Sequence, residues 1–206
     1  FERAGSVRGG ETVAVVGPGA LGLLAVQIAR ALGAGQVIVV GAVGDEARLS
    51  LAMKMGADSA LTPRPLARLP PGQFPAGEGE SLAQAVRDLT AGRGADLVIE
   101  FAGSAEAARQ SIEMTRRGGR VVLGGSTSPG RRLDVDLSLI VRGQLDVFGT
   151  VANPRGISRR ANELMAKGLV DVRPLITHHL PLSEFARAWE FFRDRREGAI
   201  RVMMHP

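Results

Sequence analysis

Six residues near the start of the chain, Gly17-Pro18-Gly19-Ala20-Leu21-Gly22, carry the strongest chemical signal in the sequence. They follow the apolar run Thr12–Val16 and open a helical pattern over Ala20–Leu32. In such a strand–turn–helix the first glycine permits a tight turn. The second lets a phosphate approach the backbone, and the third lets the helix pack closely on the sheet. Free N–H groups at the helix start then face the phosphates. The motif predicts a pyrophosphate site, the alternative being a structural turn without a ligand.

The elements needed to position this turn recur along the chain. Short runs rich in Val, Ile and Leu alternate with patterns of helical period. Strands are expected at Thr12–Val16, Val37–Val40, Leu97–Phe101 and Arg120–Leu123, and helices at Ala20–Leu32, Glu46–Met55, Leu82–Thr90 and Ala105–Arg117. Strands that are apolar throughout are buried on both faces. With right-handed crossovers, the pattern predicts an α/β protein with a doubly wound parallel sheet, the Rossmann fold.

Two parts of the chain depart from this alternation. The segment Pro63–Glu80 holds five prolines and is expected to form a surface loop, more plausibly a tolerated insertion than a lid. The pattern after Thr150 reads helix Ser158–Lys167, strand Leu175–His178, helix Ser183–Arg193 and strand Ala199–Met204. We therefore expect a dinucleotide-binding domain over 1–151 and a C-terminal helix/strand extension over 152–206.

Composition excludes several classes of protein. The chain has no cysteine, which excludes disulfides and cysteine-ligated metal sites, and no apolar run approaches the length of a membrane span. Net charge is +5, yet the basic residues are scattered, without interleaved aromatic residues, and 24 of the 26 are arginines, so nucleic acid is not an expected partner. A cytoplasmic location is the default expectation.

The choice between NAD and NADP depends on the end of the second strand. An acidic residue there binds the adenosine ribose in NAD sites, and the corresponding residues here are Gly41 and Ala42. Without the acid, the repulsion that rejects a 2′-phosphate is lost. The nearest arginine is Arg48, while Asp45 is interpreted as a helix N-cap. The choice stays open, with a slight preference for NADP.

At this point the chain resembles a known family, the medium-chain zinc-type alcohol dehydrogenases, in particular the sorbitol and threonine dehydrogenase branch. The matching stretches occur in family order over essentially the whole chain. They are Gly10–Gly22, Arg48-Leu49, Met55–Asp58, Gly94–Glu100 with Gly103, Arg117–Val122, Asp171–His178, Pro181-Leu182 and Ala188-Trp189.

The resemblance implies a role for individual residues in holding the coenzyme. Gly17, Gly19 and Gly22, with Pro18, Ala20 and Leu21 between them, match the pyrophosphate turn. The other matches are Ala102 and Gly103 beside the adenosine ribose, Gly124, Gly125 and Ser126 passing the nicotinamide, Thr150 and Val151 holding its carboxamide, and Arg201 reaching the pyrophosphate. The alternative for Arg201 is a solvated residue at a strand edge.

The resemblance also implies that zinc is held only in an N-terminal catalytic domain that precedes this region in the family, with Cys, His and Glu ligands. We therefore expect no catalytic and no metal-binding residue in this chain, which begins at Phe1 and looks like a piece of a larger protein. The neighbours His178 and His179 point to opposite faces of a strand and are assigned structural or surface roles, as is His205.

The leading interpretation is the coenzyme-binding portion of an NAD(P)-dependent dehydrogenase that moves a hydride between an alcohol or polyol and nicotinamide. A stand-alone nucleotide-binding module without catalysis and a zinc-free quinone reductase remain alternatives. A methyltransferase is disfavoured, since the late Gly118-Gly119-Arg120 fits the dehydrogenases. The segment Leu133–Val151 is apolar and resembles the family's last sheet strands, where two subunits pair, which implies a homo-oligomer, a dimer or tetramer. The alternative is that these residues fill the domain's own core.

Overall fold

The computed structural model describes residues 1, 4–63, 81–151 and 157–206. The chain folds into two compact units, Phe1–Arg155 and Gly156–Pro206. The predicted domain boundary between residues 151 and 152 stays a prediction, because residues 152–156 lie outside the described ranges. No helix in the described ranges is both long enough and apolar enough to span a bilayer.

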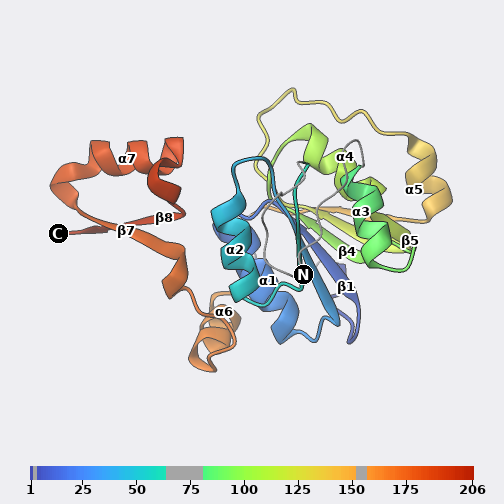
Figure 1. The fold of residues 1–206 in the computed structure, drawn as a ribbon, viewed down its shortest axis with the longest axis horizontal. Coiled ribbons are helices and arrows are strands. Elements are labelled where there is room, and N and C mark those ends of the chain that lie inside the picture. The colour runs from blue at the N-terminus through green and yellow to red at the C-terminus, as the bar shows by residue number, and fades with distance from the viewer. Residues whose placement is uncertain (2–3, 64–80, 152–156) are drawn as a thin grey trace. The chain divides into compact units, whose positions relative to one another are not determined.

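The first unit is built on a six-stranded parallel sheet (Figure 1). Its strands are β1 (Thr12–Val16), β2 (Gln36–Val40), β3 (Ser59–Leu61), β4 (Ala95–Glu100), β5 (Thr115–Leu123) and β6 (Asp146–Gly149). They lie in the order β3-β2-β1-β4-β5-β6. The direction of the order reverses at β1 and β4, as it does in a doubly wound sheet. The predicted α/β class and Rossmann arrangement are confirmed.

Helices cover both faces of this sheet (Figure 1). They are α1 (Ala20–Ala31) and α2 (Glu46–Lys54) on one face, with α3 (Leu82–Leu89) and α4 (Ala105–Glu113) on the other, and α5 (Leu137–Gly143) beside α4 and β5. Successive strand residues serve opposite faces. Ala14 and Val16 pack in one core with Val86 of α3, whereas Val15 faces α1. Both faces of β1 are fully covered, which explains its unbroken apolar sequence.

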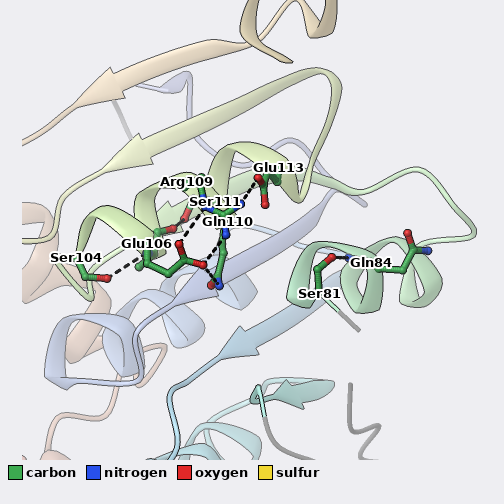
Figure 2. A network of polar contacts seen from close by, with 9 residues as sticks. Ser81, Gln84, Ser104, Glu106, Arg109, Gln110, Ser111 and Glu113 are labelled. Atoms are coloured by element: carbon green, nitrogen blue, oxygen red, sulfur yellow. Dashed lines mark hydrogen bonds and ion pairs between the residues drawn. The ribbon is translucent and has the colours of Figure 1, made fainter. Parts of the chain in front are cut away.

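The helices on the second face begin at serine caps (Figure 2). The Ser81 hydroxyl accepts a hydrogen bond from the N–H of Gln84 at 3.1 Å, and the Ser104 hydroxyl accepts one from Ala107 at 3.0 Å. On the outer side of α4, Arg109 pairs with both Glu106 and Glu113. These contacts stabilise the ends and the solvated face of helices whose other side is apolar.

A buried ion pair lies at the amino edge of the sheet, where the strands begin. Glu11 and Arg120 are both nearly inaccessible and pair with each other. The guanidinium of Arg120 also donates to the carbonyls of Ala4, at 2.5 Å, and Ser6, at 2.7 Å. The pair therefore links the segment before β1 to Arg120, within β5.

The boundary between α4 and β5 differs most from the sequence prediction. The helix expected over Ala105–Arg117 ends at Glu113, and β5 begins at Thr115 instead of Arg120. Thr115 already pairs with Ala95, and Arg116 forms an ion pair with Asp96 of the neighbouring strand. These two contacts place residues 115–117 in the sheet, so the helical period was extended too far.

Other elements were missed altogether. The strand β3 is only three residues long, too short to show a period, and α5 occupies part of Leu133–Val151, which was expected to form strands. Asp136 caps α5 by accepting from the N–H of Ser138 at 2.8 Å. The loop predicted at Pro63–Glu80 falls almost entirely outside the described residues.

The second unit is a small α/β element. It contains α6 (Ile157–Ala166), β7 (Ile176–Pro181), α7 (Phe185–Asp194) and β8 (Arg201–His205), joined by short 3₁₀ turns at Arg173–Leu175, Leu182–Glu184 and Arg196–Gly198. The strands β7 and β8 are parallel, and Leu180, Ala188, Phe191 and Ala199 form the core between them and α7. The predicted helix–strand–helix–strand order is confirmed, with ends shifted by a few residues.

Candidate functional site

Most of the predicted site residues lie along one edge of the sheet. The last residues of neighbouring strands are paired with each other: Val16 with Val40 and with Glu100, and Leu123 with both Glu100 and Gly149. The loops that follow β1, β2, β4, β5 and β6 therefore open at the same carboxyl edge. In sheets of this kind ligands bind there, at the point where the strand order reverses. Here that point lies between β1 and β4.

The glycine turn, residues 17–22, contacts the loop that follows β4. Gly17 has a φ of +96°, and a Cβ added to it would lie 2.7 Å from the backbone nitrogen of Ala102. Its own N–H donates to the carbonyl of Val40 at 2.8 Å. A side chain at this position would separate the two loops, so the turn requires glycine for both its conformation and its neighbours.

The next two glycines of the motif differ in their surroundings. A Cβ at Gly22 would overlap the carbonyl oxygen of Gly17 and lie 3.5 Å from a methyl group of Val15, so close packing requires glycine here. A Cβ at Gly19 would meet no atom of the described residues within 4 Å. The protein leaves space above Gly19, which is what the approach of a phosphate needs.

The start of α1 is suited to an anion. No side chain of the described residues caps it, and its first turn has no acidic residue. The unpaired N–H groups and the positive end of the helix dipole therefore carry no competing negative charge from this turn. Pro18, Ala20 and Leu21 shape the turn, and Leu21 leaves half of its side chain exposed.

The loops after β4 and β5 are in backbone contact. Gly103 has a φ of +74°, and a Cβ there would overlap the carbonyl oxygen of Ser126. A Cβ on Gly125 would overlap the backbone of Gly103, and one on Gly124 would lie 2.7 Å from the ring of Phe101. The structure thus brings together the residues predicted to flank the ribose and those predicted to pass the nicotinamide.

One residue at this edge was not predicted as part of the site. Glu100 ends β4 and is only 2% exposed. Its carboxylate accepts from the N–H of Gly103 at 2.5 Å and from the N–H of Gly125 at 3.3 Å. The signal in the sequence was an ionisable residue that ends an otherwise buried strand.

The loop after β2 holds the residues that bear on the 2′ position of the ribose. Asp45 occupies the N-cap position of α2, and its carboxylate accepts a hydrogen bond from the N–H of Ala42 at 3.0 Å instead of from an N–H of the helix. Arg48 lies in α2 with its side chain 11% exposed, and its guanidinium is 4.0 Å from the Asp45 carboxylate. Gly41 is buried, and a Cβ on it would lie 3.1 Å from that of Asp45. The predicted N-cap position of Asp45 is confirmed, but its side chain makes no capping hydrogen bond to the helix.

The remaining predicted residues lie in two places. Thr150 follows β6 and donates its N–H to the carbonyl of Leu123 at 2.9 Å, and Val151 beside it is 86% exposed. Arg201 begins β8 in the second unit, where it is exposed and paired in the sheet with Ile176. The predicted contact of Arg201 with the pyrophosphate stays a prediction.

The histidines of the second unit contact protein groups. The ring of His178 lies 4.8 Å from that of Phe191, and His179 forms a hydrogen bond of 2.7 Å with His205. Among the described residues, no three His, Asp or Glu side chains gather closely enough to hold a metal ion.

Comparison with known proteins identifies the family. The profile of zinc-binding dehydrogenases matches residues 20–167. The chain belongs to the zinc-binding dehydrogenase family. It corresponds to the coenzyme-binding domain of the medium-chain zinc alcohol and polyol dehydrogenases. The resemblance inferred from the sequence is confirmed.

Several members of the zinc-binding dehydrogenase family are similar over nearly the whole chain. L-threonine 3-dehydrogenase of Bacillus licheniformis is 34% identical over 93% of this chain and 51% of its own length. Sorbitol dehydrogenase of Halalkalibacterium halodurans is 29% identical over 98% of this chain and 53% of its own. The chain spans about half the length of the curated relatives it matches.

Solved structures of dehydrogenases are also similar to nearly the whole chain and match about half of their own length. An alcohol dehydrogenase from Thermotoga maritima is 32% identical with a TM-score of 0.81, over 96% of this chain and 50% of that one. A putative zinc-binding dehydrogenase from Sinorhizobium meliloti, bound to NADP, is 28% identical with a TM-score of 0.81, over 100% of this chain and 55% of that one.

Proposed function

We propose that this chain binds and orients the nicotinamide coenzyme of an NAD(P)-dependent alcohol or polyol dehydrogenase. The observation that carries the proposal is the carboxyl edge of the sheet. There an uncapped helix start, the open space above Gly19 and two glycine loops in backbone contact lie side by side. The relatives named for threonine and sorbitol oxidation support an alcohol or polyol substrate.

Each part of the edge has its own task in this proposal. The N–H groups at the start of α1 hold the pyrophosphate, and Ala102 with Gly103 flanks the adenosine ribose. The loop of Gly124, Gly125 and Ser126 passes the nicotinamide ring, and the backbone of Thr150 and Val151 holds its carboxamide. The coenzyme supplies the hydride chemistry, and the protein supplies binding and orientation. Zinc and the proton relay belong, in this proposal, to the catalytic domain of the intact protein.

Binding without turnover is the expected behaviour of the isolated chain. Titration with NADH and with NADPH, followed by their fluorescence, should give saturable binding. Alcohol oxidation with added zinc should stay at the background rate, because the proposal assigns the zinc ligands and the substrate pocket to the catalytic domain of the intact protein. Zinc-dependent turnover by the pure 206-residue chain would contradict this division of labour. Lack of binding by both coenzymes would contradict the proposed function itself.

Coenzyme preference should be weak or should favour NADPH, because Gly41 stands where NAD sites carry an acid. The variant Gly41→Asp should weaken NADPH binding roughly 10-fold or more through charge repulsion with the 2′-phosphate. The ratio of the dissociation constants of NADPH and NADH measures this effect.

The control for Gly41→Asp is Gly41→Asn, which has the same size without the charge. It is needed because any side chain at 41 is crowded by Asp45 and Leu49. If the wild-type chain prefers NADH by more than about 100-fold, another group such as Asp45 contacts the ribose, and the interpretation of Gly41 is wrong.

Self-association through the edge of the sheet is the expected state in solution. Among the strands of the described residues, β6 pairs with β5 alone and ends the sheet. The segment Leu133–Val151 leaves large apolar side chains exposed, namely Leu133, Leu137, Leu139, Val141, Val147 and Val151. Pairing of two such edges about a two-fold axis would cover both the backbone groups and the apolar side chains.

Charge placed in β6 tests this association. Val147→Asp should convert dimers or larger forms into monomers in light scattering at micromolar concentration, since Val147 is 39% exposed at the proposed contact. Phe192→Asp, which charges an exposed aromatic side chain of α7, should leave the assembly unchanged. A monomeric wild-type chain, or dissociation by the Phe192 variant alone, would end the hypothesis.

A further inference from the structure

Glu100 is an ionisable group held inside the protein at the edge of the proposed coenzyme site. Its side chain is almost fully buried, and none of the ion pairs found among the described residues includes it. A carboxylate removed from water needs hydrogen bonds in compensation. Both of its oxygens receive one: Oε1 from Gly103 N–H at 2.5 Å and Oε2 from Gly125 N–H at 3.3 Å. The two donors belong to different loops.

The glycines of these two loops are in direct contact. A Cβ on Gly125 would lie 2.7 Å from the Glu100 carboxylate and would overlap Gly103, and a Cβ on Gly103 would overlap Ser126. The loop after β5 is also held by the N–H of Gly124, which donates to the main-chain carbonyl of Glu100 at 2.9 Å. Glu100 is the group that bonds to both.

The two loops are not equally anchored by the rest of the fold. The loop after β4 runs into α4, whose first turn is capped by Ser104 at 3.0 Å. The loop after β5 continues to Asp136 without a helix or strand. We expect the bond from Gly125 to Glu100 to hold the less anchored loop against the anchored one.

We propose that Glu100 is a positioning residue that couples the two ends of the coenzyme site. By bonding to Gly103 and Gly125 together, it fixes the nicotinamide-passing loop relative to the loop that flanks the adenosine ribose. The inference rests on the proposed function and adds to it. Loss of the carboxylate should weaken binding of the nicotinamide half of the coenzyme more than binding of the adenosine half.

Affinities for NADH and for ADP-ribose, which lacks the nicotinamide, separate these two halves. In Glu100→Ala, NADH affinity should fall roughly 10–100-fold, the range typical for lost supporting hydrogen bonds, while ADP-ribose affinity falls less than about 3-fold. Glu100→Gln keeps the size of the side chain but turns an N–H donor toward one of the two backbone donors. Its effect should be intermediate.

The matched control is Glu11→Gln, which alters another buried glutamate, directly before β1 at the amino edge of the sheet. It should lower thermal stability and leave the ratio of the two affinities at the wild-type value. A Glu100 variant that is destabilised yet keeps this ratio would overturn the inference, because that is the result of a merely structural role. If Glu100→Ala does not fold, Glu100→Gln decides by the same ratio. Failure of the wild-type chain to bind NADH would overturn the proposed function, and the inference with it.

Discussion

Gly19→Asp is expected to abolish coenzyme binding without disturbing the fold. A side chain at Gly19 enters open space, so the substitution meets no atom of the described residues. The space lies at the start of α1, where the proposed pyrophosphate binds. A carboxylate there would occupy the phosphate position with the same sign of charge and would itself take up the free N–H groups. We expect the affinity for NADH to fall by at least about 100-fold, or ~3 kcal/mol.

A second open glycine provides the control for this variant. Gly9 also has no described atom within 4 Å of its added Cβ and lies before β1, at the opposite end of the sheet from the site. Gly9→Asp should bind NADH like the wild-type chain. The two variants should show the same circular dichroism and thermal unfolding as the wild type. If Gly19→Asp binds NADH with normal affinity, the glycine turn is not part of the coenzyme site.

Gly22→Ala is expected to have the largest effect on stability. A methyl group at this position would overlap the carbonyl oxygen of Gly17, which belongs to the backbone and cannot rotate away. In an unstrained helix the same change would stabilise by up to about 1 kcal/mol, because alanine favours helix more than glycine does. The overlap should reverse that sign and cost roughly 3 kcal/mol of unfolding free energy, at the upper end for overpacked cores.

Urea unfolding of Gly22→Ala and Gly19→Ala makes this comparison within one motif. Gly19→Ala should change stability by less than about 1 kcal/mol, since its methyl group meets open space. Equal stability of the two variants would contradict the close packing of α1 on β1. Loss of coenzyme binding in Gly22→Ala is also expected, because the turn must open to relieve the overlap.

The elements that the sequence predicted well are those with a clear local pattern, either an unbroken apolar run or a helical period. β1, β2 and α1 form a buried strand, a second buried strand and an amphipathic crossover, and each was placed within one or two residues. The end of α4 was misplaced because tertiary contacts outweighed the helical pattern. Arg116 forms an ion pair with Asp96 of the neighbouring strand and so lies in the sheet. Pairing between distant strands leaves no period in the sequence.

The part of the candidate site that consists of backbone groups could be predicted from the sequence. Glycines at 17, 19 and 22 follow from the geometry of a strand–helix turn around a phosphate. The role of Glu100 was not predictable, because it depends on two N–H groups that the fold brings from loops more than twenty residues apart in sequence. Asp45 stands at its predicted N-cap position, but the sequence did not reveal that its carboxylate bonds to Ala42, before the helix, instead of to the helix itself.

The central claim is that a dinucleotide binds along the carboxyl edge of the sheet in the first unit. The most direct test is titration of the isotope-labelled chain with NADH, followed by the shifts of individual backbone amide signals in NMR spectra. The largest shifts should occur at the glycine turn 17–22 and at the loops 102–103 and 124–126, while amides at the amino edge, near Glu11 and Arg120, stay in place. Saturable shifts confined to the amino edge or to the second unit, or none at all, would contradict the claim.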